Sequence, residues 1–92
     1  MKDWAFITNH GLVLLYISKH NKCTIREIAR AVGVTERTVH RSLADLEKEG
    51  YLSRVKAGGR NVYKIEHEFG LKHALTRDMP VGDLLHILNG QK

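Results

Sequence analysis

The stretch TIREIARAVGVTERTVHRSLADLEKEGYL, residues 24–52, contains two helix signals separated by a tight turn. Thr24 and Glu27 form a T-x-x-E capping box, in which each side chain accepts a hydrogen bond from the other residue's backbone N–H. Apolar residues follow at helical spacing, and Gly33 then ends the segment, because glycine adopts positive φ without steric cost. We therefore expect a short helix between the capping box and this glycine.

A second helix should begin almost at once, since only Val34 separates Gly33 from Thr35, the next cap residue. Its buried stripe consists of three apolar residues at helical spacing, Val39, Leu43 and Leu46. We expect this helix to occupy residues 35–49 and to end at Gly50. Two short helices joined by so tight a turn must cross at a steep angle.

After Gly50 the spacing of apolar residues changes from that of a helix to that of β-strands. Residues 51–55 and 61–65 are short segments rich in β-branched and aromatic residues, and KAGGR, residues 56–60, lies between them. A Gly-Gly pair in this position indicates a hairpin. No acid occurs between residues 50 and 65, whereas four basic residues do: Arg54, Lys56, Arg60 and Lys64. We expect a basic β-hairpin.

The two flanks predict one further helix each. LVLLYI, residues 12–17, is apolar on every side, and Thr8 or Asn9 could cap a helix there. Residues 66–78 have no firm period and are interpreted as a loop or extended arm, whereas Pro80 suits the first turn of a helix. The stripe of that C-terminal helix is Val81, Leu84, Leu85 and Leu88.

Length and composition fit one globular domain, residues 1–92, with a core over about 9–65 and a C-terminal arm and helix over 66–92. A formal net charge of +5 favours acidic partners, of which nucleic acid is the commonest and an anionic membrane the next. The longest apolar run is far shorter than the roughly 20 residues that cross a bilayer. We expect no membrane contact.

Cys23 is the only cysteine, so no internal disulfide can form, which suits a reducing compartment. The start of the chain carries an acid at Asp3 and lacks the apolar run of a signal peptide. We therefore expect a cytoplasmic protein.

The order helix, helix, tight turn, helix and basic hairpin is that of a winged helix-turn-helix domain. The sequence resembles winged helix-turn-helix transcriptional regulators of the MarR/ArsR-like kind over about residues 9–65. The matching features are I-x-x-I-A-x-x-V-G-V-T around the turn, T-V-x-R-x-L-x-x-L-x-x-x-G-Y-L along the next helix, and the wing GGRNVYKI. The resemblance implies a mainly α fold with a small β-hairpin (α+β): a three-helix core, a two-stranded wing and a C-terminal helix.

The resemblance also implies sequence-specific binding of double-stranded DNA, with residues 35–49 as the recognition helix in the major groove. The wing, residues 54–64, would lie on the backbone or in the minor groove. With the apolar stripe inward, Glu36, Arg37 and His40 fall on or beside the outward face. Arg37 lies in the first turn, where a guanidinium can donate two parallel hydrogen bonds to guanine.

Other residues would support this contact. Free N–H groups near Thr35 favour a phosphate, Thr38 could contact a phosphate or a thymine methyl, and Arg41 suits a phosphate. Arg60, at the hairpin tip, is our leading candidate for insertion into a narrow minor groove. Lys56 and Asn61 would contact phosphates, as could Arg26 and Arg30. The complete set of predicted DNA-binding residues is Thr24, Arg26, Arg30, Thr35, Glu36, Arg37, Thr38, His40, Arg41, Lys56, Arg60 and Asn61.

Three alternatives remain open at the level of sequence. The basic helix face could be a solvated surface in which Arg41 pairs with Asp45 at i+4. The basic hairpin could protect a sheet edge from pairing. The domain could also be a winged helix that docks proteins and does not bind DNA.

The apolar helix around residues 12–17 and the C-terminal stripe exceed what a three-helix core needs, so we expect a homodimer, with Trp4 and Phe6 also at its interface. The alternative is that the C-terminal helix folds back on its own domain. Cys23 and the six histidines are scattered without metal-ligand spacing, so we expect no metal or other cofactor. No catalytic motif and no small-molecule effector site stands out, and we expect no enzyme.

Overall fold

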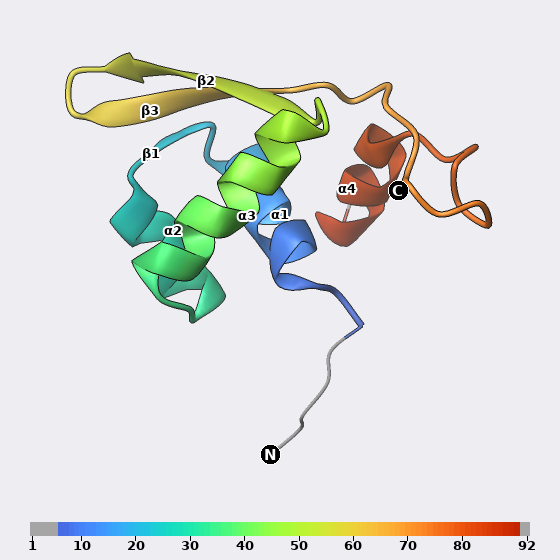
Figure 1. The fold of residues 1–92 in the computed structure, drawn as a ribbon, viewed down its shortest axis with the longest axis horizontal. Helices are drawn as coiled ribbons and strands as arrows, with labels where there is room; N and C mark the ends of the chain where they lie inside the picture. Colours follow the sequence, from blue (N-terminus) through green and yellow to red (C-terminus); the bar gives the residue numbers. More distant parts are fainter. Residues whose placement is uncertain (1–5, 91–92) are drawn as a thin grey trace.

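Three helices form the centre of the fold: α1 (Asn9–Lys19), α2 (Ile25–Val32) and α3 (Glu36–Lys48). The computed structural model describes residues 6–90. Figure 1 shows α2 and the tip of a β-hairpin at one end of the molecule and a fourth helix, α4 (Val81–Leu88), at the other. The winged-helix architecture predicted from the sequence is confirmed.

The helix boundaries follow from capping. Thr8 caps α1 by accepting a hydrogen bond from the N–H of Gly11 at 3.2 Å. The predicted capping box at Thr24 is present, because the N–H of Glu27 donates to Thr24 Oγ1 at 3.1 Å and the N–H of Thr24 donates to Glu27 Oε1 at 2.9 Å. Gly33, at φ +84°, ends α2 in the left-handed region.

The sheet has one strand more than the predicted two-stranded wing. β2 (Leu52–Ala57) and β3 (Arg60–Ile65) form the predicted antiparallel hairpin, and β1 (Lys22–Cys23) pairs with the other edge of β3. Two residues are too few to show a period of two in a sequence, and only the approach of β3 reveals the strand. The prediction of two strands was therefore incomplete, and β1 joins the hairpin to the start of α2.

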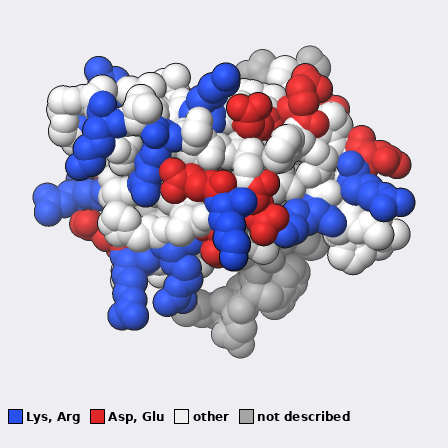
Figure 2. Space-filling model, turned by 45° about the horizontal axis from the view of Figure 1, so that its top comes forward, with Lys and Arg blue, Asp and Glu red and all other residues white. Residues whose placement is uncertain are grey.

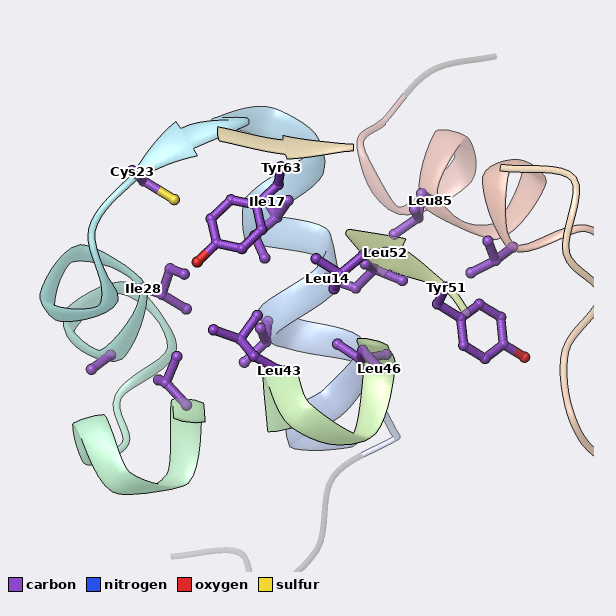
Figure 3. Close-up of a cluster of buried hydrophobic side chains, with 14 residues drawn as sticks. Leu14, Ile17, Cys23, Ile28, Leu43, Leu46, Tyr51, Leu52, Tyr63 and Leu85 are labelled. Carbon is purple, nitrogen blue, oxygen red and sulfur yellow. The ribbon is translucent and has the colours of Figure 1, made fainter. Parts of the chain in front are cut away.

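The core lies between the three helices and the inner face of the sheet. Figure 3 shows Ile17 of α1, Ile28 of α2 and Leu43 of α3 pointing into one cluster with Tyr63 of β3. The three aliphatic side chains are fully buried. This contact of one residue per helix fixes the rotation of each helix about its axis.

The C-terminal helix α4 packs on α1 of its own chain. Val81 and Leu85 are buried in the core, and Figure 3 shows Leu85 beside Leu52. Asn89 Nδ2 donates to Ser18 Oγ at 3.2 Å and ties the end of α4 to α1. The expectation that this stripe and the apolar helix around residues 12–17 are surplus to the core was therefore wrong for their buried residues. The C-terminal helix folds back as in the alternative, and Val13, Leu14 and Ile17 of α1 are buried in the same core.

Residues 66–80 form turns, as expected of an arm, with one isolated bridge between Gly70 and Pro80. Tyr51 anchors this segment, because its hydroxyl donates to the carbonyl of Gly70 at 2.7 Å. Trp4, predicted at a dimer interface, lies outside the described residues. None of the helices that the structure describes is long and apolar enough to cross a membrane.

Leu43→Ala should lower the free energy of unfolding by about 2–5 kcal/mol, because it leaves a cavity in the fully buried cluster. Leu75→Ala removes the same atoms from a residue that is 88% exposed, and it should change the free energy of unfolding by less than about 0.5 kcal/mol. Urea denaturation followed by circular dichroism measures both. Equal losses would contradict the assignment of the core.

Candidate nucleic-acid interface

The exposed face of α3 carries the residues that the sequence placed there. Burial of the stripe turns Glu36, Arg37, His40 and Arg41 outward, and all four are exposed. At the start of the helix, Thr35 Oγ1 accepts a hydrogen bond from the N–H of Thr38 at 3.1 Å. The predicted positions of these side chains are therefore as expected, and their contacts with DNA stay a prediction.

Every acid of this helix and its C-terminal cap has a cationic or imidazole partner outside the helix. The pairs are Glu36 with Arg26 at 3.7 Å, Asp45 with His10 at 2.8 Å, Glu47 with Arg54 at 3.1 Å, and Glu49 with Lys72 at 2.8 Å. Asp45 thus pairs with α1 and not with Arg41, contrary to the solvated-face alternative. Within residues 6–90, Arg37 and Arg41 have no acidic partner.

Several of the basic side chains that lack an acidic partner within residues 6–90 lie on α2, α3 and the hairpin, whereas Lys48 and Arg77, which also lack one, lie at the end of α3 and in the arm. Arg30 of α2 and Lys56 of β2 are exposed and, like the two arginines of α3, have no acidic partner among the residues that the structure describes. Figure 2 shows mostly Lys and Arg at the end that holds α2 and the hairpin tip, and a mixture of acids and bases towards α4. The positive charge is therefore concentrated where the wing and the start of α3 lie.

Arg60, predicted at the hairpin tip as the residue that enters the minor groove, forms an ion pair with α2 in this structure. Its Nη1 donates to Glu27 Oε1 at 2.6 Å. The same oxygen accepts the N–H of Thr24, so the carboxylate serves the capping box and the wing together. The hydrogen bond from Arg60, followed by that from the Thr24 backbone, lowers the pKa of Glu27.

Asn61 does not face solvent. It is only 9% exposed, and its Nδ2 donates to the Tyr63 hydroxyl at 3.2 Å on the inner face of the sheet. A buried amide cannot reach a phosphate unless the strand moves, so this placement argues against the predicted contact. The sequence could not show this burial, because strand parity alone does not say which face of the sheet is covered.

Of the remaining predicted residues, Thr24 uses both its N–H and its hydroxyl oxygen in the capping box, so its backbone N–H is not available to donate to a phosphate. Arg26 is exposed and approaches Glu36 at the start of α3. Glu27 was not predicted as part of this region, because its place in the capping box already explained its presence in the sequence. No signal along the chain pairs it with Arg60, 33 residues away.

No group of three or more potential metal ligands occurs among residues 6–90. Cys23 is buried, and burial raises the pKa of its thiol.

Two comparisons with known proteins bear on this arrangement. The model of the MarR family matches residues 7–60. A curated relative of Bacillus subtilis (strain 168), named "Uncharacterized HTH-type transcriptional regulator FruR", is 34% identical over 59 residues, which are 64% of this chain and 24% of the relative. The chain thus spans about a quarter of the length of that relative.

Glu27→Gln should lower the free energy of unfolding at pH 7, because the ion pair with Arg60 is lost while the amide oxygen can still cap α2. The folded-state pKa of Glu27 lies below its unfolded value of about 4.3, so its contribution is complete above about pH 5 and is lost as the pH falls through the folded-state pKa. Urea titrations at several pH values should show the difference from wild type shrinking below about pH 4.

Glu68→Gln is the matched control, since Glu68 is exposed and has no cationic partner among the described residues. Its effect at pH 7 should be smaller than that of Glu27→Gln. A loss in Glu27→Gln that stays constant from pH 7 to pH 3 would contradict the electrostatic origin.

Proposed function

This chain belongs to the MarR family, and on that premise we propose that it is a transcriptional regulator that binds a specific sequence of double-stranded DNA. The name of the B. subtilis relative, an HTH-type transcriptional regulator, supports the same class. The observation that carries the proposal is the pairing on α3: residues outside the helix pair with all its acids, and no acid among residues 6–90 pairs with Arg37 or Arg41.

In the proposed complex, α3 enters the major groove by its N-terminal end. Arg37, one residue after the start of the helix, is the base reader, because its guanidinium can donate to O6 and N7 of a guanine. His40, one turn later, reaches a base edge or a phosphate. The backbone N–H groups that follow Thr35 and the positive end of the helix dipole favour a phosphate.

The sheet and α2 supply contacts to the DNA backbone. Lys56 near the tip of β2 and Arg30 on α2 are exposed, so each can approach a phosphate on either side of the groove that α3 occupies. These contacts carry no sequence information, but each adds about 0.9 to the slope of log affinity against log salt.

Arg37→Ala should weaken binding to the preferred duplex by about 1–3 kcal/mol, and Arg41→Ala should reduce the salt slope by about 0.9. Fluorescence anisotropy measures both, first on a random-sequence duplex at about 50 mM salt and then on duplexes recovered by selection. Arg77→Ala makes the same charge change in the arm, outside the proposed interface, and should leave both quantities close to wild type.

No binding of any duplex at low salt would reject the DNA-binding function. The exposed face of α3 and the wing would then serve a protein partner, which is the alternative left open by the sequence.

We further propose that two copies of the chain pair, so that two recognition helices reach half-sites about one turn of DNA apart. An apolar groove of about 330 Å³ between the start of α1, the end of α3 and α4 supports this interface. Ile7, Leu84 and Leu88 line it, and Phe6 at its edge is 90% exposed.

Size-exclusion chromatography with light scattering at low micromolar concentration should give twice the mass of 10.5 kDa. Leu88→Glu places a charge in the groove and should shift the species towards the monomer, whereas Leu75→Glu in the arm should not. A wild-type monomer at these concentrations would overturn the dimer.

A further inference from the structure

The wing is attached to the helix-turn-helix by two separate links, both at the start of α2. The first is backbone: β1 pairs Cys23 with Asn61 of β3, and Thr24, the cap of α2, follows directly. The second is the hydrogen bond from Arg60 Nη1 to Glu27 Oε1 at 2.6 Å. Since Arg60 is the first residue of β3, this bond holds the tip of the hairpin.

We propose that Arg60 is a positioning residue, held by Glu27 so that the wing lies at a fixed place relative to the recognition helix, and that it does not itself contact DNA. The inference rests on the proposed function, since it concerns how two DNA-contacting elements are held together. It assigns the DNA contact of the hairpin tip to its neighbour Lys56, whose ammonium has no acidic partner within residues 6–90.

Geometry and charge distinguish this pair from an ordinary surface ion pair. Exposed pairs contribute little because two long side chains must be ordered for an attraction that water and salt weaken by screening. Here the carboxylate is already ordered by the N–H of Thr24, and the strand that carries Arg60 is already fixed by β1. The side chains of Arg60 and Glu27 are only 43% and 39% exposed, and the hydrogen bond between them lowers the pKa of Glu27.

The neighbouring residue of α2 repeats the arrangement towards the other DNA-contacting element. Arg26 lies 3.7 Å from Glu36, the first residue of α3, whereas Glu27 holds the wing. Two adjacent side chains in the first turn of α2 therefore contact the recognition helix and the hairpin. The pair of Arg26 with Glu36 is the longer and more exposed of the two and should therefore be the weaker. The proposal accordingly rests on the pair of Glu27 with Arg60.

The opposite hypothesis is that Glu27 competes with DNA for Arg60, which would leave the carboxylate when the wing enters a minor groove. The two hypotheses predict opposite signs for Glu27→Gln. This change raises the net charge by one, which by itself strengthens binding to DNA. If Glu27 competes, affinity must rise, whereas if Glu27 positions the wing, affinity must fall in spite of the added charge.

Fluorescence anisotropy over a salt series, with wild type, Glu27→Gln, Arg60→Gln and the double variant, tests the proposal on one duplex. We expect each single variant to bind about fivefold more weakly than wild type. The double variant should bind no more weakly than either single variant, since both changes remove the same hydrogen bond. The salt slope of Arg60→Gln should equal that of wild type, whereas Lys56→Gln should lower it by about 0.9.

Footprinting with hydroxyl radicals, at a temperature where circular dichroism shows all variants folded, separates positioning from general damage to the fold. In Glu27→Gln the protection at the flank, where the wing lies, should be lost while protection over the site of α3 persists. Equal loss at both places, or a gain in affinity, or a reduced salt slope in Arg60→Gln, would overturn the inference.

Arg37→Ala in the same series distinguishes failure of the inference from failure of the proposed function. Binding by wild type, weakened by Arg37→Ala but not by Glu27→Gln, rejects only the positioning role of Arg60. No binding by wild type at low salt rejects DNA binding and the positioning role together.

Discussion

Burial of one face of α3 determines which side chains the helix can offer to a partner. Val39 and Leu43 are fully buried against α1 and α2, which sets the rotation of α3 about its own axis. Arg37 and Arg41 then point outward because a helix separates its faces by its period of 3.6 residues. Hydrophobic packing, which is not specific to any ligand, thereby determines which charged side chains face the solvent. A loss of core packing would therefore change both the stability of the fold and the binding of a partner by α3.

Local signals explain why most of the fold could be predicted from the sequence. The capping box at Thr24, the stop at Gly33 and the hairpin turn at Gly58-Gly59 each depend on residues within a few positions of one another. Such signals survive in a sequence because the atoms that interact are close along the chain. β1 has no such signal, since two residues adopt strand geometry only when β3 supplies the hydrogen bonds.

The candidate site could be predicted only in part, for a related physical reason. Helical periodicity correctly placed Arg37 and His40 on the exposed face. It could not show that Asp45 pairs with His10, or that Arg60 pairs with Glu27, because these partners are 35 and 33 residues apart. The sequence does not show which distant residue forms an ion pair with a given charged residue. An unpaired cation can therefore be identified only from the three-dimensional positions of the acids.

These long-range pairs decide which basic residues can bind a phosphate without first losing an acidic partner. The net charge of the chain does not show which residues these are. Arg54, Arg60 and Lys72 each have a carboxylate within 3.1 Å, whereas Arg37 and Lys56 have none among the described residues. A phosphate must displace an existing partner to bind a cation of the first group, but need only displace water from the second. Phosphate binding should therefore follow the pattern of pairing more closely than the count of basic residues. The hairpin tip illustrates this, because its two basic residues, Lys56 and Arg60, fall in different groups.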